Sequence, residues 1–532
     1  MRLRLAVMVP AAAVTAALLP FVVTGTSHGQ DVRTERASVS TGGVEVDAAS
    51  IQAGMSADGR YVVFASDAAD LVANDSGNLD IFVHDRQTGT TERVSIASDG
   101  TPAGAPSLFP AISGDGRYVV FQSDATNLVS PDTNATDIFL RDRVTGTTTR
   151  VSVASGGAPG NGDSETPSIS ANGRYVTFTS LADNLATDDG NQDRDVFVRD
   201  LVAGTTELAS LATDGTLGNN ASGGLGAGPA RISNDGRYVV FGSFADTLVA
   251  NDLNHSDDIF VRDRVAATTE RVSIATDGTE RAGHSMYGSI SDDGRYVAFF
   301  SDAPLLTADD SDSVSDVFLR DRTAGVTTRL SAGPGGAPPD GPSRFPVISA
   351  GGGVIAFQSD ATNLAANDMN GVTDVFLYHM AGGTIERVSV ADGGSEGNGA
   401  STSPSVSSDG TTAAFQSSAG NLVAGDGNGV TDVFVRGKAL GPEPTSTPTP
   451  RPPTVTPTPT SGPCQPRMGD ANGDGSVNSL DALFILQFVA NLVSSLPNPG
   501  NADVNQDGHI TPVDAFLLLQ YQAGLIRCLP PP

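Results

Sequence analysis

The sequence of 532 residues carries 31 Lys and Arg against 61 Asp and Glu, a net charge of −30 at neutral pH. This excess of acids excludes nucleic acid and an anionic membrane as main partners, because phosphate binding requires clustered cations. The length, with 61 Gly and 32 Pro, indicates several domains or one turn-rich repeat domain with accessories.

Residues 1–30 have the layout of a secretory signal. Arg2 and Arg4 precede a mostly apolar run over residues 5–23, and small residues follow at 24–29. We expect cleavage between about residues 25 and 30, and hence a secreted protein. The alternative is an uncleaved membrane anchor, because the apolar run is long enough to span a bilayer. No later segment is apolar enough to do so.

A nine-residue motif, Ser-Ala-Asp-Gly-Arg-Tyr-Val-Val-Phe in its first copy at residues 56–64, occurs seven times in the sequence. The copies are spaced by 57 to 63 residues, and the last two are weaker. A fixed period of this length is typical of repeat architectures. Each copy ends in a phenylalanine, and these are Phe64, Phe121, Phe178, Phe241, Phe299, Phe357 and Phe415.

Each repeat predicts four short strands. In the first repeat, an Asp-Gly turn precedes a β-rich segment at residues 60–66. A loop rich in Asp and Asn leads to the segment at 80–85, and a Thr-Gly turn leads to the segment at 92–96. Seven repeats of four strands favour a mainly β fold, a seven-bladed β-propeller over residues 31–440. A flat β-solenoid is the competing fold, although its repeats are usually shorter.

The two ends of the repeat region predict how the ring closes. The seventh copy stops at residues 432–436 without a fourth strand. Residues 35–40 (Glu-Arg-Ala-Ser-Val-Ser) match the fourth strand of the first repeat, Glu-Arg-Val-Ser-Ile-Ala at 92–97. We therefore expect the N-terminal strand to complete the last blade and to leave no unpaired inner edge.

These repeats resemble the TolB-type propeller family, whose blades carry Ser-Pro-Asp-Gly before an apolar strand that ends in Phe. Residues 56–59, 113–116 and 291–294 match that signature except at the proline, while the sixth copy, at 349–353, lacks the aspartate. The resemblance covers about residues 31–437. It implies the fold and says little about function, because propellers host many activities.

The long connections of all blades share one face, which is the default place for ligand contact. In these connections, two side chains with oxygen atoms stand two residues apart and a further Asp follows four residues later, as in Asp252, Asn254 and Asp258. Such oxygens either bind Ca²⁺ or form side-chain turns that begin the third strand, and the turns are favoured. The same pattern occurs at Asp368, Asn370 and Asp374, at Asp426, Asn428 and Asp432, and at Asp310, Asp312 and Asp316. No catalytic constellation is identified.

Residues 441–463 form a Pro/Thr-rich linker, which predicts an extended, semi-rigid tether. The only two cysteines, Cys464 and Cys528, bracket the module that follows. In an oxidising compartment they are expected to form a disulfide, and two free thiols are the alternative.

The C-terminal module, residues 464–532, contains two twelve-residue loops with EF-hand spacing. Oxygen donors stand at positions 1, 3, 5, 9 and 12, a carbonyl at position 7, and glycine at position 6, where the chain must bend sharply. Helices are expected at 481–491 and 512–524, and neither loop is preceded by a helix pattern. The predicted Ca²⁺ ligands are Asp470, Asn472, Asp474, Ser476, Asn478 and Asp481 in the first loop, and Asp503, Asn505, Asp507, His509, Thr511 and Asp514 in the second.

A duplicated loop–helix with Asp at position 12 resembles a type I dockerin over about residues 467–526. The resemblance implies folding that depends on Ca²⁺ and docking onto a cohesin module. Cohesins usually recognise dockerins at the two residues before loop position 12. These are Ser479 and Leu480 in the first loop, and Pro512 and Val513 in the second. They depart from the common Ser-Thr pair and from each other, so the cohesin type stays open.

The leading hypothesis is a secreted propeller that acts as a binding module and is anchored by its dockerin to a cohesin-bearing scaffold or cell surface. The alternative is a polysaccharide-degrading glycoside hydrolase with its active site on the long-loop face, because dockerins usually carry such cargo. A protein-binding disc is a third possibility. Two carboxylates converging in a pocket at about 5–10 Å would favour hydrolysis.

Overall fold

The computed structural model describes residues 32–73, 77–187, 189–440, 470–472, 476–489, 495–504, 510 and 512–522. The chain divides into two compact units, with the boundary between Thr445 and Ser446. The predicted signal (1–30), the linker (441–463) and both cysteines lie outside the described residues. No helix in the described part of the chain is long and apolar enough to cross a membrane.

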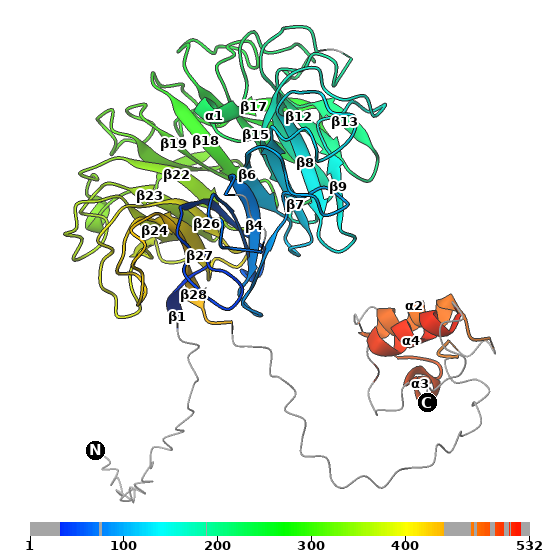
Figure 1. The fold of residues 1–532 in the computed structure, drawn as a ribbon. Helices are drawn as coiled ribbons and strands as arrows, with labels where there is room; N and C mark the ends of the chain where they lie inside the picture. Colours follow the sequence, from blue (N-terminus) through cyan, green and yellow to red (C-terminus); the bar gives the residue numbers. More distant parts are fainter. Residues whose placement is uncertain are drawn as a thin grey trace, which may run out of the picture. The chain divides into compact units, whose positions relative to one another are not determined.

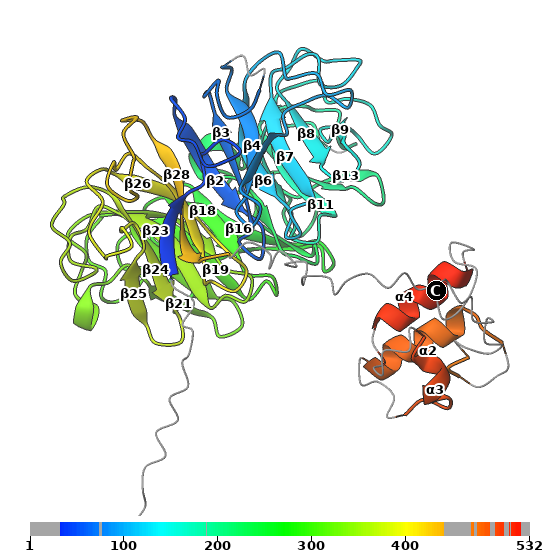
Figure 2. The same cartoon turned by 60° about the horizontal axis from the view of Figure 1, so that its bottom comes forward.

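The first unit is the predicted seven-bladed β-propeller, drawn from two directions in Figures 1 and 2. Each blade is a four-stranded antiparallel sheet, and in the first six blades the strands run in chain order from the inside outward. The first three blades are β2 (Ser50–Met55), β3 (Tyr61–Ser66), β4 (Asp80–Asp85) and β5 (Thr90–Arg93); β6 (Ser107–Ile112), β7 (Tyr118–Ser123), β8 (Asp137–Asp142) and β9 (Thr147–Arg150); β10 (Ser164–Ile169), β11 (Tyr175–Ser180), β12 (Asp195–Asp200) and β13 (Thr205–Leu208).

The next three blades follow the same plan, except that a short helix, α1 (Gly224–Ala227), precedes a two-residue inner strand in the fourth. A 3₁₀ turn, η1 (Pro334–Gly336), lies before the sixth. Their strands are β14 (Arg231–Ile232), β15 (Tyr238–Ser243), β16 (Asp258–Asp263) and β17 (Thr268–Arg271); β18 (Ser285–Ile290), β19 (Tyr296–Ser301), β20 (Asp316–Asp321) and β21 (Val326–Arg329); β22 (Ser343–Ile348), β23 (Val354–Ser359), β24 (Asp374–His379) and β25 (Thr384–Arg387).

The last blade confirms the predicted ring closure. It combines β26 (Ser401–Val406), β27 (Ala413–Ser417) and β28 (Asp432–Lys438) with β1 (Val32–Arg36) from the N-terminal end. Strand β1 pairs antiparallel with β28, from Val32 opposite Lys438 to Arg36 opposite Phe434. Strand β1 begins and ends earlier in the sequence than the predicted residues 35–40. It ends at Arg36, the position equivalent to Arg93, where the fourth strand of the first blade also ends.

A pair of phenylalanines fills the centre of every blade. Phe64 on β3 lies opposite Phe82 on β4, with ring centroids 5.9 Å apart and both side chains fully buried. The other six blades repeat the pair at 5.7 to 6.1 Å. Aromatic pairs of this kind add about 0.5–1.5 kcal/mol beyond the area they bury, which explains why the motif ends in Phe.

The glycine in the turn of the motif packs against a side chain of the preceding blade. Gly116 has φ +72° and faces the ring of Tyr61 from the preceding blade, whose Cδ2 lies 2.1 Å from where a Cβ would stand. Only glycine accommodates both this conformation and this approach. The same contact recurs between Gly173 and Tyr118 and between Gly236 and Tyr175.

The second unit contains helices α2 (Ser479–Val489), α3 (Pro499–Ala502) and α4 (Pro512–Gln522). Helix α2 begins two residues before the predicted start. Helix α3 was not predicted from its Pro-Asn-Pro-Gly sequence; Pro499 stands at its first turn, where a missing N–H costs nothing. The core shared by the described segments is small and consists of Ala471, Ala482, Ile485, Leu496, Ala502, Val504, Ala515 and Leu518.

Candidate functional site

In the first loop of the C-terminal unit, the aspartate at position 12 folds back over the loop. Asp481 is fully buried, and its two carboxylate oxygens accept hydrogen bonds from the backbone N–H groups of Asn472 (3.1 Å) and Asn478 (2.9 Å). Asp470 at position 1 is also buried, at 3% exposure. The described donors of this loop are all oxygens, the ligand type that Ca²⁺ prefers, and the arrangement fits the ion.

The second loop repeats the feature. Asp514 is fully buried, and its Oδ1 accepts a hydrogen bond from the backbone N–H of Val504 at 2.7 Å. Asp503, at position 1, directly follows α3. The predicted ligands Asp474, Asn505, Asp507, His509 and Thr511 lie outside the described residues, so their part in the sites stays a prediction.

Both helices that follow the loops expose large apolar side chains. Leu483 and Leu486 on α2 are 47% and 42% exposed, and Leu519 and Tyr521 on α4 are 43% and 38% exposed. Leu486 and Leu519 occupy equivalent positions in the two copies of the loop–helix. Ser479, at the start of α2, is also exposed, whereas the side chains of Leu480, Pro512 and Val513 lie outside the described part.

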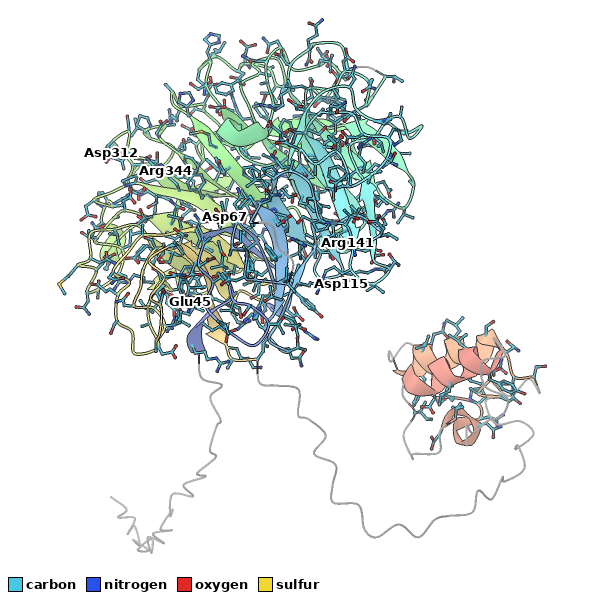
Figure 3. The ribbon with its side chains drawn as sticks, in the orientation of Figure 1. Glu45, Asp67, Asp115, Arg141, Asp312 and Arg344 are labelled. Carbon is cyan, nitrogen blue, oxygen red and sulfur yellow. The ribbon has the colours of Figure 1, made fainter. Side chains whose placement is uncertain are left out.

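On the propeller, the acidic loops described from the sequence contain arginines that the sequence analysis did not anticipate. Arg271, the last residue of β17, lies 3.1 Å from both Asp252 and Asp258 and also contacts Glu280. We call such a group an arginine-filled acid cluster. The sixth blade repeats it around Arg387 with Asp368, Asp374 and Glu396, and the seventh around Arg36 with Glu45 (labelled in Figure 3), Asp426 and Asp432.

The remaining polar groups of these loops act as turns. Asn254 Oδ1 accepts a hydrogen bond from the backbone N–H of Ser256, and its Nδ2 donates to Asp258. The other oxygen of Asp258 accepts a hydrogen bond from Ser273. Asp312, also labelled in Figure 3, caps its own loop by accepting from the N–H of Val314. The structure therefore favours the turn reading for the clusters named in the sequence analysis.

A cavity of about 320 Å³ lies among the innermost strands of the propeller. Its lining takes residues from all seven blades, including the rings of Phe109, Tyr287 and Phe345. Tyr287 and Phe345 meet edge to face, with centroids 4.5 Å apart. Five prolines stiffen the wall: Pro110, Pro167, Pro229, Pro346 and Pro404. The sequence analysis had no signal for this cavity.

Backbone strain is concentrated at the same place. Six inner strands carry a β-bulge whose central residue has a positive φ of 50° to 60° although it is not glycine. This conformation costs about 1 kcal/mol or more at each residue. Glutamines of neighbouring strands stabilise several bulges; Gln52 Oε1, for example, accepts from the N–H of Phe109 at 2.8 Å. The six residues, Gln52, Phe109, Thr166, Tyr287, Phe345 and Ser403, all line the cavity.

Arg231 is the one charged residue among those that line the cavity. Its backbone pairs with Val240 on β15, but its side chain forms no ion pair or hydrogen bond with any residue that the structure describes. Burial lowers the pKa of its guanidinium, because removal from water disfavours the charged form. A cation without a counter-charge, in a cavity that three aromatic rings also line, is suited to an anion that also carries an apolar or aromatic part.

Residues 468–521 match the dockerin type I domain. Dockerin domains bind Ca²⁺ and cohesin modules, and the proteins that bear them are typically extracellular or attached to the cell surface. No curated protein matches the chain.

Among solved structures, TolB from Acinetobacter baumannii is 17% identical at a TM-score of 0.33, and the match covers 57% of this chain and 58% of that one. An oligogalacturonate lyase in complex with manganese is 13% identical over 77% of this chain and 91% of its own, at a TM-score of 0.45. The β-propeller domain of the Trilobed protease from Pyrococcus furiosus is 10% identical over 74% and 96%, at a TM-score of 0.43. The chain thus spans less than two thirds of the first of these proteins, and likenesses this low concern the fold alone.

Proposed function

We propose that the chain is an exported ligand-binding protein, whose C-terminal unit docks on a cohesin-bearing partner and whose propeller binds an anionic ligand in its central cavity. The observation that supports docking on a cohesin, the docking half of this proposal, is the dockerin match at residues 468–521. The observation that supports binding of an anion in the propeller, the ligand half of the proposal, is the side chain of Arg231, which lines the cavity without an ion-pair partner among the described residues.

The docking half rests on two features of the C-terminal unit. Each of the two EF-hand-type loops would hold one Ca²⁺ ion, and the bound ion would supply the positive charge that ties the carboxylates of its loop together. The buried Asp481 and Asp514 fix the loop backbone to the start of α2 and α4. The exposed Leu483, Leu486 and Leu519 then offer the apolar surface that a partner would cover.

The ligand half rests on the chemistry of the cavity wall. Arg231 supplies a planar cation that can donate paired hydrogen bonds to a carboxylate, and Tyr287, Phe345 and Phe109 supply ring faces and edges. The described lining residues include no carboxylate, whereas glycoside hydrolysis requires a pair of them. The cavity therefore supports binding better than polysaccharide hydrolysis.

Titration calorimetry with an aromatic carboxylate and its neutral ester tests the ligand half. Ferulate should bind the full chain, and methyl ferulate should bind at least about tenfold more weakly, since one charge-assisted pair is worth about 1.5–3 kcal/mol. Arg231→Gln should abolish this preference. Arg141→Gln is the matched control, because Arg141 lies on β8 outside the cavity wall (Figure 3) and should leave binding unchanged. Equal binding of acid and ester by the unmodified chain would contradict the proposal.

A further inference from the structure

Every blade holds an aspartate at the first position of its third strand, and the seven share one environment. One oxygen of this aspartate accepts a hydrogen bond from a serine that follows the fourth strand, as Ser95 donates to Asp80 and Ser210 to Asp195. In six blades the other oxygen lies 2.9 to 3.4 Å from an arginine at the end of the fourth strand. The six arginines are Arg36, Arg93, Arg150, Arg271, Arg329 and Arg387.

The third blade breaks the pattern. Its fourth strand, β13, ends in Leu208, which stands where Arg271 stands in the fourth blade. Leu217 takes the place of Glu280, the third acid of that cluster. The nearby Arg194 is engaged elsewhere, with its Nη2 3.1 Å from Glu165. No arginine of the described residues therefore reaches this position.

The acids of the third blade nevertheless remain. Asp195 is fully buried, and its Oδ2, the oxygen that takes the arginine in the other blades, has no hydrogen-bond partner among the described residues. Asp189 stands two positions before Asn191, as Asp252 stands before Asn254. The amide Nδ2 of Asn191 donates to the carbonyl of Gly218 at 3.1 Å, while its oxygen accepts from the N–H of Asp193. That amide fixes the loop and also lies near Asp195, where it lowers the pKa of the carboxyl against the larger raising effect of burial. The amide is neutral, however, and no cation of the described residues compensates the buried carboxylate oxygen.

We propose that the third blade binds a hard divalent cation, Ca²⁺, between Asp189 and the buried Oδ2 of Asp195, in the place that an arginine occupies in the other six blades. Two carboxylates offer the ligand atoms that this ion prefers, and backbone carbonyls or water complete its coordination. The site lies on the propeller and is independent of the dockerin loops.

The electrostatics of the pair agree with this assignment. Burial and the charge of Asp195 together raise the pKa of Asp189 to about 6, with a smaller contribution from Asp183. Two like charges held together out of water favour a bound cation or a shared proton.

Counting the calcium bound by the full chain tests the proposal. The chelator-stripped protein is dialysed at pH 7 against a fixed Ca²⁺ concentration, and the metal is measured by mass spectrometry. Leu208→Arg installs the residue that six blades already accommodate, so this variant should fold and bind one ion fewer than the unmodified chain. Asp195→Asn should lose the same ion. Arg271→Leu, the reciprocal change in the fourth blade, should gain one.

A second pair of variants distinguishes the calcium ion proposed for the propeller from the ions bound by the dockerin loops. Asp481→Ala with Asp514→Ala, introduced both into the unmodified chain and into Leu208→Arg, removes the dockerin ions from each protein and should preserve the difference of one ion between them. Equal calcium content in the unmodified chain and in Leu208→Arg, with Asp195→Asn also unchanged, would overturn the third-blade site. That result would leave the docking proposal intact.

Discussion

Replacing Arg36 by leucine should weaken the closure of the propeller ring. The side chain of Arg36 is 8% exposed, and its Nη1 lies 2.6 Å from Glu45, 3.4 Å from Asp426 and 3.2 Å from Asp432. The carboxylates of Asp426 and Asp432 are almost fully buried, at 4% and 0% exposure. Breaking a buried pair by removing one partner costs about 3–5 kcal/mol, since the remaining charge is left unpaired out of water.

Leucine is the appropriate replacement because the third blade carries Leu208 at the equivalent position, buried at 8% exposure. The loss of stability then reports the missing guanidinium at a position where the fold already accommodates leucine. Arg33→Leu is the matched control on the same strand. Its side chain is 48% exposed, and among the described residues it forms an ion pair with Glu35 alone, so its effect should stay within about 0.5 kcal/mol.

Chemical denaturation in the presence of a chelator measures the difference. The chelator matters, because a cation could otherwise replace the lost guanidinium. Arg36→Leu should unfold the propeller at a clearly lower denaturant concentration than Arg33→Leu does, and adding Asp426→Asn should restore part of the loss. If both single variants unfold at the midpoint of the unmodified chain, β1 does not hold the ring shut in the way we describe.

Two further predictions concern the repeat turns and the third blade. Gly116→Ala should destabilise the propeller by more than the roughly 1 kcal/mol that positive φ alone costs, because its Cβ would meet the ring of Tyr61; Gly146→Ala, at φ +69° with only Arg141 within 4 Å, should show the conformational cost alone. Equal denaturation midpoints for the two variants would refute the packing argument. Without Ca²⁺, the raised pKa of Asp189, about 6 against 3.8, makes the folded state bind a proton that the unfolded state has released. The stability of the stripped protein should therefore fall as pH rises from about 4 to about 7, and thermal melts of Leu208→Arg should show a shallower fall; parallel curves would speak against the acid pair.

Much of the fold could be predicted because the same strand and turn pattern occurs in seven copies of the repeat. The phenylalanine period predicted the number of blades, and the likeness of residues 35–40 to 92–97 predicted the closing strand. Strand ends were less certain, since the residues after Arg93 keep an extended pattern although the ladder has ended. The dockerin loops were recognisable because metal ligation demands fixed residue types at fixed spacing.

The cavity and the arginines could not be predicted in the same way. The cavity depends on β-bulges, which are shifts of register between neighbouring strands and leave no mark in the hydrophobic pattern. Five of the six arginines lie 13 residues after the aspartate that begins the third strand of their blade, and Arg36 lies 396 residues before Asp432. Their role becomes visible only when the strands pair. One signal was present in the sequence: aligning the repeats shows Leu208 where the others have arginine.

The most direct test of the proposed function is the affinity of the full chain for immobilised type I cohesins in Ca²⁺ and in chelator. We expect binding in Ca²⁺ to at least one cohesin, and loss of that binding in chelator and in the variant that combines Asp481→Ala with Asp514→Ala. Leu208→Arg should bind as the unmodified chain does, because its change lies on the propeller. Binding that persists in chelator, or that survives the loss of both aspartates, would contradict docking through the calcium loops.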